Sequence, residues 1–234
     1  MYDDEESDNR KFNTLKNEEL WFSTIKKLND PYEFKFLYID EEKLIKQNRS
    51  EVLDIFKKLF NQISTNWGLT SLSGNSYNYL PMWAYYTNNY HGYCVEYDVL
   101  RPDTVFKVEY EPKRYPVANT LIAYYSEVMR SLLSEEDDMS QLEELYGMIL
   151  RYNLIAKHDS WQHENEYRIL SPIEEIKYGK AVPLSAIYLK TSRIIVGYNC
   201  KPEHIERLNS ISQEIGCGQI SKVELSETEY TLLG

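Results

Sequence analysis

The sequence predicts a single domain of the α+β class, with a mixed, mostly antiparallel sheet, flanking helices and a C-terminal strand–helix–strand unit. Its 234 residues, 42% of them hydrophobic, are enough to bury the core of one compact domain. Long stretches carry apolar residues at three- and four-residue steps, which is typical of helices. The last third contains short β-branched and aromatic runs, which favour strands. We therefore expect one domain over residues 1–234.

The first predicted elements are a strand, a loop and a long helix. Residues 20–22 are aromatic and apolar, and they lead to the turn signal of residues 29–31, where Pro restricts φ. Residues 41–65 have the apolar period of a helix, with a break expected near Asn48. Residues 68–79 are rich in Ser, Asn and Gly, which predicts a loop.

Two strands and two helices are expected in the middle of the chain. Residues 93–97 and 105–110 both alternate between apolar and polar, and we expect them to form adjacent antiparallel strands. Helices should follow at about residues 117–133 and 139–157. The acidic residues 134–138 between them are suited to capping the second helix.

The C-terminal third returns to strands. Short strands are expected at residues 167–170, 186–190 and 194–197. A helix then begins at Pro202 and ends at Gly216, and residues 220–225 form a last strand. Such a strand–helix–strand unit usually crosses over right-handed, which makes its two strands parallel.

Charge and composition indicate the cellular compartment of the protein and exclude some classes of partner. Acidic residues outnumber basic ones by 37 to 26, a net charge of −11, so binding to a phosphate backbone is disfavoured and a nucleic-acid partner is unlikely. No run approaches the roughly 18 apolar residues of a membrane span, and the acidic N-terminus is unlike a secretory signal. The three cysteines form no Cys-x-x-Cys pair. We expect a cytoplasmic protein that binds no membrane.

Familiar catalytic motifs are missing from the sequence. It has no phosphate-binding loop, no dinucleotide-binding glycine motif, no nucleophile elbow and no zinc-binding helix motif. ATPase, dehydrogenase, hydrolase and zinc-protease activities are therefore disfavoured. The four histidines do not have a ligand spacing, and no metal site is expected.

The most informative segment is residues 157–168, KHDSWQHENEYR. If its end is a strand, Glu164, Glu166 and Arg168 share one face. In one interpretation Arg168 and Lys157 neutralise the two carboxylates in a ladder of ion pairs. In the other, one carboxylate faces a cleft while its neighbour raises its pKa or orients it. Both interpretations stay open, and Glu166 is the residue that we expect to matter most.

Two further groups of residues are candidate ligand contacts. The turn that contains Asn29, Asp30 and Glu33 should pack near the segment that ends at Arg168, because embedded polar residues usually meet a partner. The aromatic run around Trp83 is either core or the wall of a site for a flat ring, and we expect Trp83 to be buried with its N–H bonded. The candidate ligand-binding residues are Asn29, Asp30, Trp83, Tyr85, Tyr86 and Trp161.

Three blocks carry a resemblance to a known family: LWFSTIKKLNDPYEF, MWAYYTNNYHGYCVEYD and KHDSWQHENEYRIL. In this order and spacing they resemble the family of domain of unknown function 2971, over about residues 15–200. The resemblance implies an intracellular bacterial or phage protein without a settled activity. The family typically has an extra strand before the position of Tyr2, which this sequence does not contain.

Three functions from different classes remain. The first is an NAD-using enzyme similar to ADP-ribosyltransferases, in which Glu164-Asn-Glu166 resembles a late Glu-x-Glu element and Glu166, Glu164 and Arg168 are the candidate catalytic residues. A carboxylate there would stabilise the oxocarbenium character that develops when the nicotinamide bond breaks, while Tyr85, Tyr86 or Trp83 stacks on the ring. The second is a binding or regulatory module for an unknown small molecule or protein, whose polar blocks are structural. The third is a nucleic-acid processing enzyme. The first of these functions uses NAD as its cofactor, and the other two imply no particular cofactor.

Overall fold

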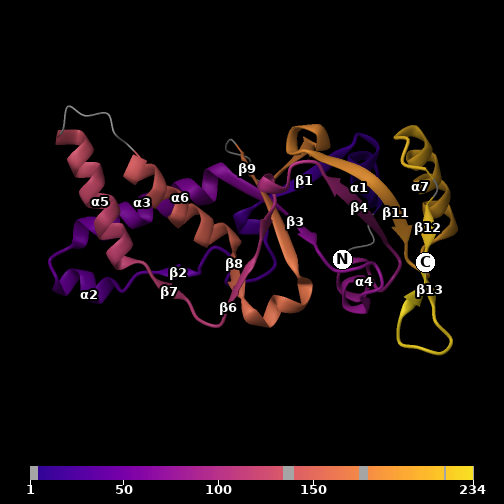
Figure 1. Cartoon of the computed structure of the whole chain (residues 1–234), viewed down its shortest axis with the longest axis horizontal. Coiled ribbons are helices and arrows are strands. Elements are labelled where there is room, and N and C mark those ends of the chain that lie inside the picture. The colour runs from indigo at the N-terminus through magenta and orange to yellow at the C-terminus, as the bar shows by residue number, and fades with distance from the viewer. Residues whose placement is uncertain (1–4, 134–139, 174–178, 219, 234) are drawn as a thin grey trace. The chain divides into compact units, whose positions relative to one another are not determined.

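The computed structural model describes residues 5–133, 140–173, 179–218 and 220–233. The chain divides into two compact units. Unit 1 comprises Met1–Phe22, Leu72–Val105 and Ala181–Gly234, and unit 2 comprises Ser23–Ser71 and Phe106–Lys180. Helices and mixed sheets occur together, which confirms the α+β class (Figure 1). That the chain is a single domain stays a prediction.

Unit 1 contains a three-stranded sheet in the order β12, β11, β4 (Figure 1). Strands β11 and β4 are antiparallel, whereas β11 and β12 are parallel and are connected through α7, which confirms the predicted C-terminal strand–helix–strand unit. The elements that lie wholly or mostly in this unit are α1 (Glu5–Lys16), β1 (Glu19–Thr24), α4 (Leu80–Tyr86), β4 (Tyr93–Val99), η2 (Pro102–Thr104), β10 (Lys180–Pro183), η4 (Leu184–Ile187), β11 (Leu189–Val196), α7 (Pro202–Glu214), β12 (Ser221–Lys222), β13 (Glu224–Leu225) and β14 (Leu232–Leu233).

Helices α1 and α7 pack together in unit 1. Helix α7 begins at Pro202, whose missing N–H costs nothing there, and it ends before Gly216, which has a φ of +68° that favours glycine. Helix α1 was not predicted, because Phe12 and Leu15 are the only strongly apolar residues of a polar segment. Both are buried against β11 and α7, so tertiary packing stabilises a helix that the apolar pattern of the sequence does not predict.

Unit 2 is built on strands β1, β3, β9 and β5, which neighbour one another in that order. Strands β1 and β3 are antiparallel, with Ser23 opposite Leu69, and so are β5 and β9, with Phe106 opposite Arg168. By contrast, β6 runs parallel to β8 and β2 runs parallel to β7. The further elements of this unit are η1 (Ile25–Lys27), β2 (Leu37–Tyr38), α2 (Glu41–Lys46), α3 (Ser50–Asn66), β3 (Trp67–Ser73), β5 (Phe106–Lys107), β6 (Glu109–Glu111), β7 (Tyr115–Pro116), α5 (Ala118–Leu133), α6 (Ser140–Ile155), β8 (Ala156–His158), η3 (Asp159–Glu164) and β9 (Glu166–Pro172).

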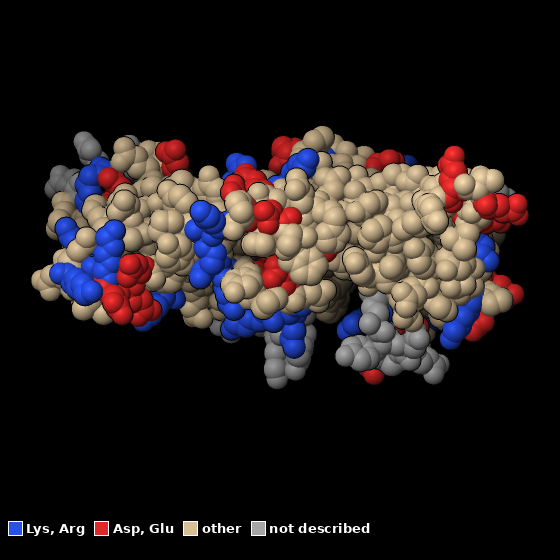
Figure 2. Space-filling model, turned by 90° about the horizontal axis from the view of Figure 1, so that it is seen from below, with Lys and Arg blue, Asp and Glu red and all other residues tan. Residues whose placement is uncertain are grey.

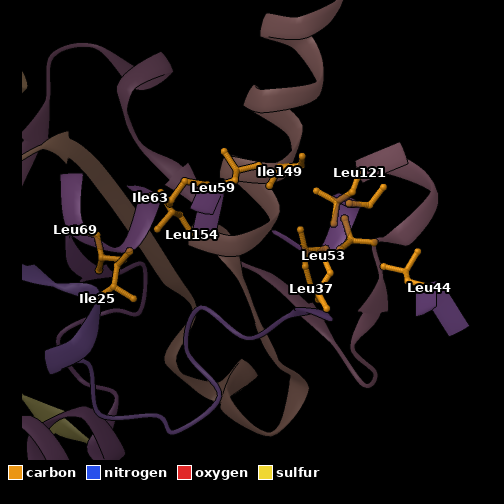
Figure 3. Close-up of a cluster of buried hydrophobic side chains, with 12 residues drawn as sticks. Ile25, Leu37, Leu44, Leu53, Leu59, Ile63, Leu69, Leu121, Ile149 and Leu154 are labelled. Atoms are coloured by element: carbon orange, nitrogen blue, oxygen red, sulfur yellow. The ribbon is translucent and has the colours of Figure 1, made fainter. Parts of the chain in front are cut away.

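The core of unit 2 lies between α3, α5 and α6 (Figure 3). Leu59 and Ile63 of α3 point toward Ile149 and Leu154 of α6 in this view, as the helical period of the sequence predicts. The helix break predicted near Asn48 is confirmed: α2 ends at Lys46, α3 begins at Ser50, and Asn48 has a φ of +58°. The predicted helices at residues 117–133 and 139–157 are also present, as α5 and α6.

The loop prediction for residues 68–79 was wrong in its first half, because Trp67–Ser73 form β3, a strand between β1 and β9. Gly68 explains the error. A Cβ at this position would lie 2.7 Å from the Cδ1 of Ile173 and 3.1 Å from the carbonyl oxygen of Ser23, so the glycine permits close packing inside the sheet. Sequence pattern alone assigns such a Gly- and Ser-rich segment to a loop.

The pairing of residues 93–97 with 105–110 was also wrong. Strand β4 pairs with β11, and the second stretch divides into β5, which pairs with β9, and β6, which pairs with β8. Strands that are consecutive in sequence often pair, but here each strand pairs with one that is distant in sequence.

Several C-terminal boundaries also differ from the prediction. Residues 186–190 are not one strand, because η4 ends at Ile187, Tyr188 has a φ of +56°, and β11 then continues without a break to Val196. Residues 221–225 form two short strands, β12 and β13, on either side of the buried Val223. The predicted cap at residues 134–138 lies outside the described residues.

Candidate functional site

Five charged side chains of unit 2 form a charged cluster, made of Glu33, Lys157, Glu164, Glu166 and Arg168. Their side chains are only 1% to 8% exposed. Charged residues are almost never buried to this degree unless they are paired. Hydrogen bonds and ion pairs must therefore compensate the buried charges of this cluster.

Strand β9 presents two members of the cluster on one face. Glu166 and Arg168 are two residues apart and both buried, as the alternation of a strand predicts. Glu164 was expected on the same strand face, but it is the last residue of the 3-10 helix η3, and Asn165, with a φ of +45°, separates it from β9. Asparagine tolerates this left-handed conformation better than most residues, and it ends the helix where the strand begins.

A turn after η1 places Glu33 in the cluster. Asp30 is buried, and its Oδ1 accepts a hydrogen bond of 2.8 Å from the backbone N–H of Tyr32. The carbonyl of Asp30 also accepts from the N–H of Glu33. Aspartate commonly builds such a turn. The expectation that this loop meets the segment ending at Arg168 is confirmed through Glu33, whereas Asn29 is exposed.

Arg168 uses all five of its N–H groups. Its Nη2 and Nη1 donate to Glu33 at 2.7 and 3.0 Å. Its Nε and Nη2 donate to Glu166 at 2.7 and 3.2 Å, and Nη1 also donates to the backbone carbonyl of Leu154 at 2.7 Å. Arg168 thus makes two bidentate carboxylate pairs at once, which is the geometry in which a guanidinium binds most strongly.

Glu166 has its acceptor sites filled in the same way. Its Oε1 accepts from the Nε of Arg168 and, at 2.5 Å, from the hydroxyl of Ser71. Its Oε2 accepts from the Nζ of Lys157 at 2.9 Å and from the Nη2 of Arg168. A carboxylate offers about four lone-pair sites, so these four bonds saturate it. The backbone N–H of Glu166 donates to the hydroxyl oxygen of Tyr110.

Lys157 links the three carboxylates. Its Nζ lies 2.7 Å from Glu164, 2.9 Å from Glu166 and 3.7 Å from Glu33. The ring of Trp161 lies 4.8 Å from the same ammonium, as a cation–π contact. The ion pairs that the sequence suggested for Lys157 and Arg168 are therefore present. Sequence reasoning did not find Ser71 and Tyr110, because both contacts join segments that are distant along the chain.

The pKa values follow this pairing. Burial alone would raise the pKa of Glu166, but the charge and hydrogen bonds of Arg168, with Lys157 and Ser71, lower it to about 2. Burial raises the pKa of Glu33 above its usual value, although Arg168 and Lys157 oppose this. Burial opposes the charge of Lys157, but the neighbouring carboxylates raise its pKa. Glu166 therefore stays ionised over the whole neutral range.

Three of the four aromatic candidates, Trp83, Tyr85 and Tyr86, belong to unit 1 and differ greatly in exposure, whereas Trp161 belongs to unit 2. Trp83 is 3% exposed and packs among Ile195, Val223 and Leu232, and its indole N–H donates to the carbonyl of Tyr77. The prediction of a buried, hydrogen-bonded Trp83 is confirmed, so this ring is core and does not form a pocket wall. Tyr85, by contrast, is 66% exposed.

Unit 1 contains a pocket of about 430 Å³, which lies within the roughly 300–1,000 Å³ of sites for small molecules. Phe12 forms part of its lining, stacked on Tyr93 at 5.8 Å and contacted edge-on by His204 at 5.4 Å. The residues that line it are Asp8, Arg10, Lys11, Phe12, Thr14, Leu15, Glu19, Leu20, Trp21, Tyr86, Thr87, Asn88, His91, Gly92, Tyr93, Val95, Tyr97, Cys200, Lys201 and His204. Tyr86 is the one sequence-predicted ligand contact among them.

Residues 82–169 match the model of the family described as protein of unknown function (DUF2971). This match confirms the resemblance over residues 82–169, which include the second sequence block and the third as far as Ile169. The first block, residues 20–34, and the rest of the predicted range of about residues 15–200 lie outside it. No curated protein and no solved structure matches the chain.

The DUF2971 match includes parts of both candidate sites. Within the charged cluster it covers Lys157, Glu164, Glu166 and Arg168 but not Glu33. Within the pocket it covers the wall made by the end of α4 and by β4. The family match therefore does not by itself select one of the two sites.

Figure 2 shows Lys and Arg interspersed with Asp and Glu in small groups on the face it presents, with wide uncharged areas between them. A surface for nucleic acid would gather basic residues in a stripe or patch. That nucleic acid is an unlikely partner stays a prediction. Among the described residues, no helix is both long and apolar enough to cross a membrane. The described residues also contain no group of three or more His, Cys, Asp and Glu placed to hold a metal ion.

Proposed function

We propose that this protein is a small-molecule binding module, in which the charged cluster stabilises unit 2 and the pocket of unit 1 takes the ligand. One observation carries the proposal. All five N–H groups of Arg168 and all four acceptor sites of Glu166 are used within the protein. A substrate would have to break one of these bonds before it could contact either residue.

The competing function is an ADP-ribosyltransferase-like enzyme that consumes NAD. It needs a carboxylate that contacts the ribose as positive charge develops. Glu166 is buried, and its charge is already neutralised by Arg168 and Lys157, so it is poorly placed to stabilise a cation on a substrate. The binding module is therefore favoured, and NAD consumption becomes the outcome that would contradict it.

The pocket has the mixed character of a small-molecule site. Aromatic rings supply apolar contact area, and a few polar groups on α1, β4 and α7 are available to orient a ligand. Asn88 and His91 follow α4, and the ring Nδ1 of His91 lies 2.8 Å from the carbonyl oxygen of Asn88. In that arrangement Nδ1 donates to the carbonyl, which holds the imidazole in place.

The test combines a thermal-shift screen of planar small molecules with an assay of NAD consumption. Thr14→Trp should fill the pocket, and Asn13→Trp, an exposed neighbour on the same helix, is the matched control. We expect compounds that raise the melting temperature of the wild type and of Asn13→Trp but not of Thr14→Trp, because ligand binding to the native state stabilises it. We expect no NAD turnover by the wild type.

The charged cluster is tested separately with Glu166→Gln, and Glu109→Gln is the control because its ion pair with Arg151 is partly exposed. If the wild type consumes NAD and a folded Glu166→Gln variant does not, the proposed binding module is wrong and the transferase activity is supported. Ligands that still stabilise Thr14→Trp, or a screen in which no compound stabilises the wild type, would contradict the assignment of the pocket.

A further inference from the structure

The charges around the pocket of unit 1 are not balanced. Arg10, Lys11 and Lys201 line it as cations, and Asp8 and Glu19 line it as anions. Lys11 is neutralised by Asp8 at 3.0 Å. Arg10 and Lys201 have no ion pair with any residue that the structure describes, and both are exposed. Arg10 and Lys201 are thus two lining cations that no described residue neutralises, and Glu19, which also makes no ion pair with a described residue, offsets one of them, so that the lining carries one excess positive charge.

This local excess contrasts with the net charge of −11 of the whole chain. An acidic protein repels anionic ligands over long distances, so a site for an anion needs cations close to the bound group. Lys201 is the residue that precedes α7, a helix of 13 residues. The positive end of the helix dipole adds a smaller contribution of the same sign.

The rings around the pocket favour a flat ligand. The guanidinium of Arg10 lies over the ring of Trp21 at 5.2 Å, so a cation and an aromatic surface occur together. Tyr86 also lines the cavity, whereas Phe12 is 3% exposed, is stacked on Tyr93 and is covered by the guanidinium of Arg207 at 4.4 Å, so this ring supports the wall from within the core. An aromatic side chain beside a cation offers a planar ring both stacking and charge contacts.

We infer that the pocket of unit 1 binds a planar anion of about the size of a nucleoside monophosphate, with its ring among the aromatic side chains and its acidic group beside Arg10 and Lys201. This inference rests on the proposed function, since it names the ligand class of the same pocket. The acidic group is held by charge and the ring by stacking, so a ligand with both should bind more tightly than a ligand with only one.

The experiment uses calorimetry on the full chain at low ionic strength, with AMP, adenosine and inorganic phosphate as probes. We expect AMP to bind at least tenfold more tightly than either adenosine or phosphate. Lys201→Gln and Arg10→Gln should each weaken AMP binding several-fold and leave adenosine binding unchanged. Lys16→Gln is the control, because Lys16 also lies on α1 but pairs with Glu214 and does not line the pocket.

The possible results separate the inference from the proposed function. Equal affinities for adenosine and AMP, or AMP binding that is insensitive to Lys201→Gln and Arg10→Gln, would overturn the inference. A pocket that binds only neutral planar compounds of the screen would also overturn it while leaving the proposed function intact. If no planar compound binds in the pocket, both are wrong. Weakened AMP binding in Lys16→Gln as well would indicate a diffuse charge effect and would contradict a defined site.

Discussion

The charged cluster of unit 2 and the pocket of unit 1 both contain Lys and Arg, but the two regions use these charges in opposite ways. In the cluster, Lys157 and Arg168 are at most 8% exposed and are surrounded by carboxylates. At the pocket, Arg10 and Lys201 are exposed and have no ion pair among the described residues. A charge that is saturated by its own protein stabilises the fold, whereas an exposed charge beside a cavity is available to a ligand.

The energetic consequences of removing a charge should differ accordingly. A buried charge that loses its partner keeps the cost of desolvation without the compensating attraction. An exposed charge that is removed leaves only water behind, and most surface substitutions change stability by less than about 0.5 kcal/mol.

Arg168→Met should lower the free energy of unfolding by about 3–5 kcal/mol, because it leaves Glu33 and Glu166 buried without their main cation. Arg151→Met is the control, since Arg151 is 61% exposed and pairs with Glu109. The control should lose at most about 1 kcal/mol. Urea denaturation monitored by circular dichroism measures both variants. Similar losses for Arg168→Met and Arg151→Met would show that the cluster does not stabilise unit 2.

Glu166→Gln should cost roughly 1–3 kcal/mol at neutral pH, since the amide keeps the shape but leaves Arg168 poorly paired. The stability lost in Glu166→Gln should become smaller as the pH falls. The pKa of Glu166 falls from an ordinary value of 4.5 to about 2 in the folded protein, so its stabilisation is complete above pH 4.5 and is lost as the pH falls toward 2.

The difference in unfolding free energy between the wild type and Glu166→Gln isolates this effect. The pKa of Glu33 is raised, so its ionisation destabilises the folded protein as the pH rises, which is opposite to the effect of Glu166. Glu33 is present in both proteins, so its contribution to the difference cancels. Urea titrations at several pH values between 2 and 7 measure the difference. A difference that stays constant over this range would refute the assigned ionisation of Glu166.

Lys201→Gln should change the free energy of unfolding by less than about 0.5 kcal/mol, because its exposed side chain makes no ion pair within the described part of the chain. The same urea titration measures it, beside Arg168→Met. A loss approaching that of Arg168→Met would mean that the pocket cations also serve the fold, and the contrast between the two regions would disappear.

Local patterns were sufficient for much of the fold. The helical period predicted α3, α5 and α6, and Pro202 with Gly216 marked the two ends of α7. These features depend on residues within a few positions of one another, so a sequence contains the information directly. The burial of Trp83 was predictable for a related reason, since a dense aromatic run is too apolar to remain in water.

The candidate sites were only partly predictable. The segment 157–168 indicated a charged group on a strand, but the strand begins only at Glu166, and Glu164 reaches the cluster from a 3-10 helix. The pocket was not predicted as a site, because its walls come from α1, β1, β4 and α7, and α1 gives no strong apolar pattern. Tyr86 was found only through its place in an aromatic run.

Local sequence patterns are enough to predict the α+β class, most helix positions, the turn at Asp30 and the opposite charges around Glu166. The partners that saturate those charges depend on the tertiary structure, because Ser71 lies 95 residues and Glu33 135 residues from the β9 side chains that they contact. The formation of strand β3 depends on the tertiary structure as well, since the space beside Gly68 is limited by Ile173 and Ser23. Helix periods are local, whereas strand pairing and the burial of charge depend on contacts between distant segments, so only the folded chain specifies them.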